Sequence, residues 1–128
     1  MSFFLKFREG YIEEKRDLID EIVDKIRSAD IKDMRIKNIN SIGGMLVHEP
    51  EEHLFLIDIN DKFADVKMTD DLFIMKDSTT YSNPSELSSF LNSAKNSQRL
   101  KNISIISVPE RYDAATAFSE ILKLFKKT

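Results

Sequence analysis

The segment 53–68 constrains the fold of this chain more than any other part of the sequence. Apolar residues alternate on both sides of positions 61–62, and a hairpin turning there would gather them on one face. A shift of one residue would bring Asp65 onto that apolar face, so the pattern also predicts the pairing register. In this register Asp58 lies opposite Asp65 on the other face, with Lys67 one step along. Two like charges in that position need a compensating partner.

Hydrophobic periodicity predicts three helices, at 11–28, from Pro84 to about 96 and from about 113 to 127. Proline suits the first position of a helix because its missing N–H has no intrahelical partner there. We expect a single globular α+β domain over residues 1–128, with a mixed, mostly antiparallel sheet of about five to six strands and three helices. The expected order is α-β-β-β-β-β-α-β-α, and the expected strands cover 34–42, 45–47, the two arms of the hairpin within 53–68, 72–75 and 103–108.

The composition narrows the class of protein and its location. The chain has no cysteine, which excludes disulfides and thiolate metal sites and fits a reducing compartment. No apolar run reaches the length of a membrane span. We therefore expect a cytoplasmic protein that has no membrane partner. The net charge of −3 and the lack of aromatic residues among the basic ones near the strand at 103–108 argue against nucleic acid as a partner.

The aspartate pair suggests one catalytic alternative. Asp58 on one strand, followed by Asp65-x-Lys67 on the next, resembles the metal-binding signature of the PD-(D/E)xK nuclease superfamily. The resemblance implies that the two carboxylates hold Mg²⁺ or Mn²⁺ and that the lysine positions a water molecule. Hard cations take carboxylate oxygens and can generate a nucleophile near neutral pH. In this alternative the chain is a metal-dependent nuclease-like enzyme acting on nucleic acid.

Two histidines raise a second metal hypothesis. His48 and His53 flank three glutamates in a six-residue segment. Pro50 prevents a continuous helix through it, and the spacing differs from the HExxH pattern that places two histidines on one helical face. Zinc binding here would need a loop that gathers the ligands, and an acidic turn between two strands explains the same residues.

The polar loop at 78–85 is a candidate ligand site. It follows the expected strand at 72–75 and precedes a helix, which is where open α/β sheets bind ligands. The start of that helix could receive an anion. No glycine-rich phosphate loop accompanies it. The loop therefore supports a small-ligand or anion binder as a further alternative.

Phe3, Phe4 and Phe7 give the N-terminal segment an aromatic character. As a strand, the segment would either dock on the protein's own core or offer a surface for association, because exposed aromatic clusters are typical of interfaces. No catalytic cysteine or G-x-S-x-G serine occurs in the sequence. The predicted function is therefore a small non-catalytic interaction module that self-associates or binds another protein, and that carries no cofactor.

Overall fold

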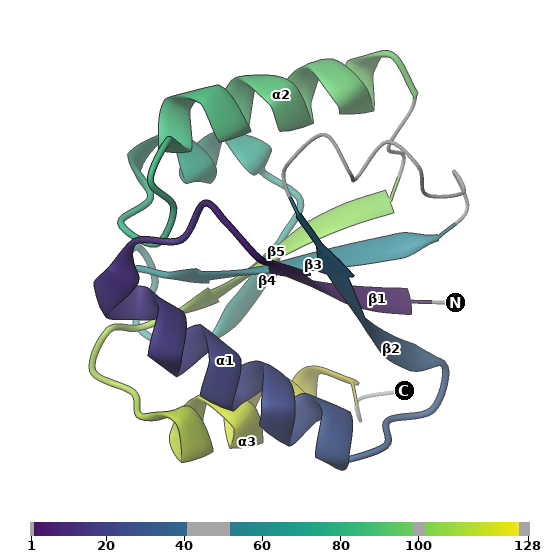
Figure 1. Cartoon of the computed structure of the whole chain (residues 1–128), viewed down its shortest axis with the longest axis vertical. Coiled ribbons are helices and arrows are strands. Elements are labelled where there is room, and N and C mark those ends of the chain that lie inside the picture. The colour runs from purple at the N-terminus through teal and green to yellow at the C-terminus, as the bar shows by residue number, and fades with distance from the viewer. Residues whose placement is uncertain (1, 41–51, 99–101, 126–128) are drawn as a thin grey trace.

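The computed structural model describes residues 2–40, 52–98 and 102–125. Five strands form one sheet in the order β2-β1-β3-β5-β4 (Figure 1). No helix in the described ranges combines the length and the apolar character needed to cross a membrane. The elements are β1 (Ser2–Phe7), α1 (Glu13–Ser28), β2 (Met34–Ile39), β3 (His53–Ile59), β4 (Lys67–Thr69), the 3-10 helix η2 (Leu72–Asp77), α2 (Pro84–Asn96), β5 (Asn102–Val108) and α3 (Ala114–Phe125).

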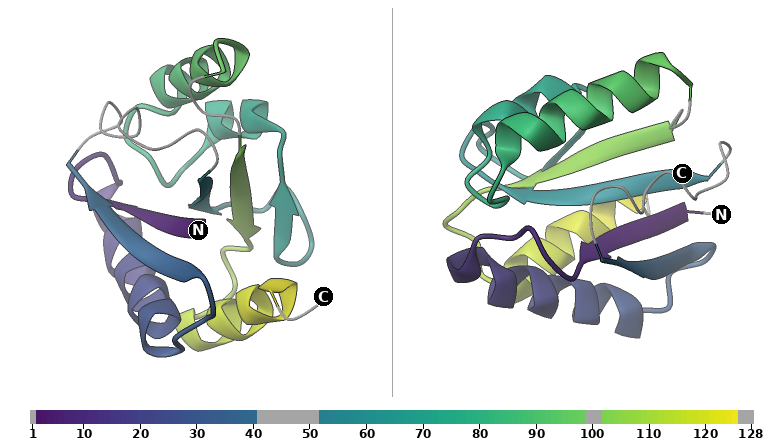
Figure 2. Two further views of the ribbon diagram at one scale, coloured as in Figure 1. Left: turned by 90° about the vertical axis from the view of Figure 1, so that its right-hand side faces the viewer. Right: turned by 45° about the horizontal axis from the view of Figure 1, so that its top comes forward.

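Helices cover both faces of the sheet (Figures 1 and 2). Helices α1 and α3 contact each other on one face, and α2 and η2 contact each other on the opposite face. Strands β3 and β5 lie side by side within the sheet, and all but the first residue of each is buried. Nearly continuous burial is typical of parallel strands that are covered on both faces.

The predicted α+β class, with a mixed sheet of about five strands and three helices, is confirmed. The predicted balance of strand directions is wrong. Strands β1, β2, β3 and β5 are parallel to their neighbours, and only β4 is antiparallel, to β5. One reason is that α1 is a crossover connection between β1 and β2, which returns the chain to the same end of the sheet.

The predicted hairpin at 53–68 is also wrong, because β5 lies between β3 and β4. Asp58 pairs with Ser107 of β5, and Lys67 pairs with the same serine from the other side. The alternation in the sequence does not mark a solvated face of β3, since that strand is buried on both faces. Strand β3 has a partner strand on each side, β1 and β5, and both come from distant parts of the chain.

The N-terminal strand forms, but it does not offer an interaction surface. Strand β1 lies between β2 and β3, and Phe4 and Phe7 are only 0% and 3% exposed. Phe3 is half-buried, and the ammonium of Lys37 lies 4.7 Å from the centre of its ring. The aromatic residues proposed for self-association are therefore mainly core residues.

The expected strand at 72–75 is the 3-10 helix η2 instead. The carboxylate of Asp71 accepts a hydrogen bond from the backbone N–H of Phe73 (3.1 Å), which caps the start of the helical turn. The expected strand at 45–47 lies outside the described residues. Pro84 begins α2 as predicted.

Candidate active site at the carboxyl edge of the sheet

A buried polar network lies at the carboxyl end of β3. Asp58 is fully buried and accepts hydrogen bonds from the hydroxyl of Ser78 (2.5 Å) and from the amide nitrogen of Asn60 (2.6 Å). The amide oxygen of Asn60 accepts in turn from the hydroxyl of Ser107 (2.8 Å) and from the backbone N–H of Lys62 (3.0 Å). Both carboxylate oxygens of Asp58 therefore have a donor, which a buried charge requires.

The same network fastens the loop that follows η2 to the end of β3. The hydroxyl of Thr80 accepts from the backbone N–H of Ile59 (2.7 Å), and the backbone N–H of Thr80 donates to the Ser78 hydroxyl (3.0 Å). The phenol of Tyr81 donates to the carbonyl of Ile57 (3.0 Å). These bonds leave Thr79, the one exposed residue of the segment 78–81, at the surface above β3.

An exposed constellation surrounds Thr79. The carboxylate of Glu110 lies 2.8 Å from the ammonium of Lys15 and 3.4 Å from the hydroxyl of Thr79. The backbone N–H of Glu110 donates to the carboxylate of Asp61 (3.0 Å). Lys15 lies in the first turn of α1, Asp61 follows β3, and Glu110 follows β5. Four separate segments thus bring a cation, two carboxylates and a hydroxyl together.

The position of this constellation is that of a ligand site in an open α/β sheet. Ligands in such sheets bind outside the carboxyl ends of the strands, near the point where the connections diverge to opposite sides. Here the connection from β1 leads to β2 on one side, and β3 continues toward β5 and β4 on the other. We therefore regard Lys15, Asp61, Thr79 and Glu110 as the candidate active site.

Two buried tyrosines lie next to this edge and form structural hydrogen bonds. The rings of Tyr11 and Tyr81 are 5.2 Å apart, and the Tyr11 hydroxyl accepts from the backbone N–H of Phe7 (3.2 Å). Burial raises the pKa of Tyr11 to about 12. Burial, and to a smaller extent the neighbouring Tyr11, raises the pKa of Tyr81 well above its usual value. Both phenols therefore stay neutral near neutral pH and act as structural hydrogen-bonding groups.

A second polar cluster occupies the opposite, amino-terminal edge of β3 and β5. The Ser104 hydroxyl lies 2.9 Å from Nε2 of His53 and donates to the carboxylate of Asp70 (2.8 Å). Burial lowers the pKa of His53, and the charge of Asp70 opposes this in part. The residue types are those of a serine hydrolase, but the order differs, because the serine lies between the histidine and the aspartate. Ser104 is also only 2% exposed, so a substrate cannot reach it.

The structure separates the residues predicted to form the nuclease-like site. Asp58 is buried beneath the loop at 78–81, whereas Asp65 is exposed and accepts from the hydroxyl of Tyr112 (3.0 Å). The ammonium of Lys67 lies 4.6 Å from the centre of the Phe63 ring, on the far side of β5 from Asp58. The two aspartates thus do not form a common site.

The histidine hypothesis is reduced to one described residue. His48 lies outside the described residues, and His53 bonds to Ser104 as given above. Within residues 2–40, 52–98 and 102–125, no group of three or more histidine, cysteine, aspartate or glutamate side chains could hold a metal ion. The structure therefore assigns no metal ligands in these ranges.

Lys15 and Glu110 were not among the residues predicted from the sequence. They are 95 positions apart, and no local pattern connects them. A signal did exist for Glu110, since it follows directly after the strand at 103–108 and its closing Pro109. The loop at 78–85, predicted as a ligand site, contains Thr79, but the prediction named neither Lys15 nor Glu110 beside it.

Comparisons with known proteins identify the fold. No protein-family model and no curated protein matches the sequence. Among solved structures, the chain is similar to the [NiFe] hydrogenase maturation protease HybD from Thermococcus kodakarensis, with a TM-score of 0.55 and 12% sequence identity. The match covers 98% of this chain and 99% of that one. The two proteins share a fold.

This likeness corrects the predicted function. The similar protein is by its name a protease, and this finding overturns both the predicted non-catalytic, self-associating module and the nuclease alternative. The further alternative, a small-ligand or anion binder at 78–85, is likewise non-catalytic and is abandoned for the same reason. The fold and the polar cluster at its carboxyl edge lead instead to a catalytic hypothesis.

Proposed function

We propose that this chain is a hydrolase that cleaves a peptide bond in a protein substrate, with Glu110, Lys15 and Thr79 at the reaction centre. The observation that carries the proposal is the position of the Glu110 carboxylate, 2.8 Å from the Lys15 ammonium and 3.4 Å from the Thr79 hydroxyl. The fold likeness to a maturation protease supports the reaction class. A cytoplasmic location and a protein partner, here the substrate, belong to the same proposal.

The proposed reaction uses these three side chains in separate roles. Glu110 accepts a proton from a water molecule, and the water oxygen attacks the carbonyl carbon of the substrate. The Lys15 ammonium stabilises the negative charge that develops on the carbonyl oxygen. The bond between carbon and nitrogen then breaks, and Glu110 returns the proton to the leaving amine. The Thr79 hydroxyl lies 3.3 Å from the carbonyl of Ile59 and 3.4 Å from Glu110, and in the proposed reaction its single proton is donated to Glu110.

Packing explains why these groups can hold their geometry. Thr79 is fixed between two residues, Ser78 and Thr80, whose hydroxyls bond to Asp58 and to the backbone of Ile59. Glu110 is fixed by its own backbone N–H, which donates to Asp61. A catalytic group held by its neighbours loses little freedom when the substrate binds.

The test is a cleavage assay with the purified protein and a mixture of synthetic peptides, read by mass spectrometry. We expect cleavage by the wild type, a loss of about 100-fold or more in Glu110→Gln and a smaller loss in Lys15→Met. Glu120→Gln is the matched control, because Glu120 is also paired with a lysine (Lys123, 2.9 Å) but lies on the outer part of α3. It should cleave as the wild type does.

Two results would refute the proposal. One is a wild-type protein that cleaves none of the peptides. The other is a Glu110→Gln variant that retains wild-type cleavage, because an uncharged amide cannot accept the proton from water.

A further inference from the structure

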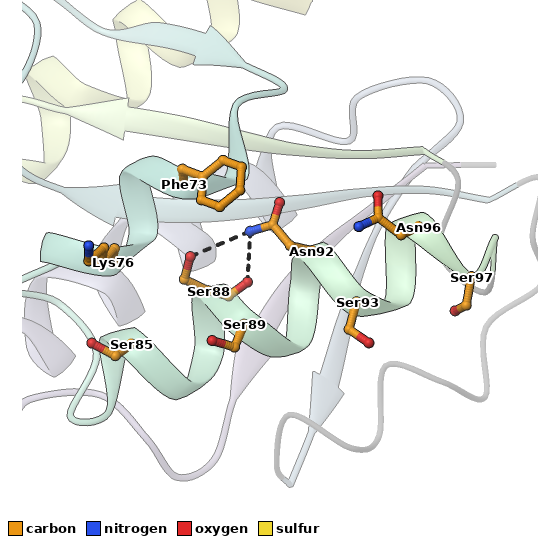
Figure 3. Close-up of a pocket in the computed structure, with 9 residues that line it drawn as sticks. All are labelled: Phe73, Lys76, Ser85, Ser88, Ser89, Asn92, Ser93, Asn96 and Ser97. Atoms are coloured by element: carbon orange, nitrogen blue, oxygen red, sulfur yellow. Dashed lines mark hydrogen bonds between the residues drawn. The ribbon is translucent and has the colours of Figure 1, made fainter.

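A groove separates α2 from η2 on the face opposite α1 and α3 (Figure 3). Its volume is about 830 Å³, within the range of sites that bind small molecules or short peptide segments. Helix η2 contributes Phe73 and Lys76 to its wall. The opposite wall consists of uncharged polar residues of α2, chiefly Ser85, Ser89, Asn92, Ser93 and Asn96.

The wall formed by η2 combines an apolar and a cationic group. Phe73 is 67% exposed and is the one large apolar side chain that lies exposed in the described part of the chain. Lys76 follows three positions later, and it is the one charged residue of the lining. Residues i and i+3 of a 3-10 helix lie above one another, about 6 Å apart along the axis. Both groups therefore face the groove from the same side.

The wall formed by α2 provides hydrogen-bonding groups at a regular spacing. Ser85, Ser89 and Ser93 are four positions apart, which corresponds to about 6 Å along the helix. An extended peptide repeats its N–H and C=O directions every two residues, or about 6.7 Å. The amide nitrogen of Asn92 donates to the backbone carbonyl of Ser88 (2.8 Å), which holds this side chain beside Phe73. The spacing of the serines on α2 and the repeat of an extended peptide are therefore close enough for several hydrogen bonds to form between them.

We propose that this groove binds an extended peptide segment of the protein substrate. An apolar side chain of the peptide packs on Phe73, and a carboxylate two residues away pairs with Lys76, because two residues of extended chain span the same distance as one turn of η2. The serine and asparagine side chains of α2 bond to the peptide backbone. The inference deepens the proposed function, because it specifies the substrate as an extended segment with an apolar residue and an acidic residue at that spacing.

The test measures binding separately from cleavage. The probe is a fluorescein-labelled nonapeptide of glycine and serine that carries one leucine two residues before one aspartate, and fluorescence anisotropy reports its binding. We expect saturable binding by the wild type, and affinities reduced at least about fivefold in Phe73→Ser and in Lys76→Gln. Ser89→Leu, an exposed position where the larger side chain fills the groove, provides a second variant that should also lose binding. Lys123→Gln is the control for the lysine change and should bind as the wild type does.

A second peptide, with asparagine in place of aspartate, tests the pairing with Lys76. It should bind the wild type about as weakly as the first peptide binds Lys76→Gln. When the asparagine peptide is combined with Lys76→Gln, the loss of affinity should be no larger than with either change alone. Absence of binding by the wild type, or unchanged binding in Phe73→Ser and Ser89→Leu, would overturn the inference. If Glu110→Gln binds the peptide as the wild type does, but neither the wild type nor any variant cleaves it, the proposed reaction is refuted and the assignment of the groove stands. If Phe73→Ser cleaves peptides at the wild-type rate, the groove is not the site of substrate binding, and the proposed reaction stands.

Discussion

Replacing Asp58 by asparagine tests whether the buried network is specified by the direction of its hydrogen bonds. Asp58 is fully buried, and its two carboxylate oxygens accept from Ser78 and from the amide nitrogen of Asn60. In Asp58→Asn one of those oxygens becomes an NH₂ group. The remaining oxygen can still accept from Ser78, but the new NH₂ group then faces the NH₂ group of Asn60, and two donors cannot bond to each other.

Asn60 cannot turn its amide over without a loss elsewhere. Its oxygen already accepts from Ser107 and from the backbone N–H of Lys62. One buried donor is therefore left without an acceptor, at a cost of about 1–3 kcal/mol. Removing the buried charge returns part of its desolvation cost. We expect a net loss of about 2 kcal/mol in the free energy of unfolding.

The reciprocal change makes the prediction sharper. Asn60→Asp alone places a second carboxylate at the 2.6 Å contact with Asp58, and we expect it to destabilise the protein by at least as much. In the double variant Asp58→Asn/Asn60→Asp, the new amide donates to the new carboxylate. Ser78, Ser107 and Lys62 keep their acceptors. The double variant should therefore recover most of the wild-type stability.

Urea unfolding followed by circular dichroism measures all four proteins. A loss of about 2 kcal/mol lowers the urea midpoint by roughly 1 M for a chain of this size. Additive effects of the two changes would show that hydrogen-bond direction does not specify the network. If Asp58→Asn unfolds at the wild-type urea midpoint, the predicted loss is wrong, and the hydrogen bonds of the Asp58 carboxylate do no more than offset the cost of burying it.

Two further predictions concern pH. The pKa of His53 is lower in the folded state than its ordinary 6.5, so the unfolded state binds more protons below that pH. The free energy of unfolding should therefore fall as the pH drops through about 6.5. Urea unfolding at about pH 7.5 and about pH 5 should show this fall in the wild type and a smaller one in His53→Asn. The pKa of Tyr11 is raised from 10.0 to about 12 in the folded state. Its contribution to the free energy of unfolding is therefore fully present below pH 10, and about 3 kcal/mol of it is lost as the pH rises toward 12. Tyr11→Phe should remove this part of the alkaline loss but cost about 1–2 kcal/mol at neutral pH, because the N–H of Phe7 loses its acceptor.

The elements that the sequence predicted well are those specified by local patterns. Buried residues of α1 recur at helical spacing, from Ile19 through Ile22 and Val23 to Ile26, and acidic and basic residues occupy its first and last turns. Pro84 marked the start of α2, and the β-branched run at 103–108 marked β5. Each of these signals lies within about fifteen residues of chain.

The strand pairing and the candidate site were not predicted from the sequence, because both depend on segments that are distant along the chain. Strand β3 pairs with β1 and β5, and neither partner is its neighbour in the sequence. Asp58 meets Ser78 across 20 positions, and Lys15 meets Glu110 across 95. A hairpin between neighbouring segments was the shorter connection and satisfied the alternation equally well.

The buried network and the exposed site depend on each other. Asp58 holds Ser78, and Thr80 holds the backbone of Ile59, so the residue between them has little freedom to move. That residue is Thr79, whose hydroxyl lies 3.4 Å from the carboxylate of Glu110. A change that weakens the network should therefore displace Thr79 before it unfolds the protein, since loops at the edge of a sheet open at lower free energies than its central strands. The burial of an aspartate in β3, unfavourable by itself, is thus explained by the position it imposes on the loop above it.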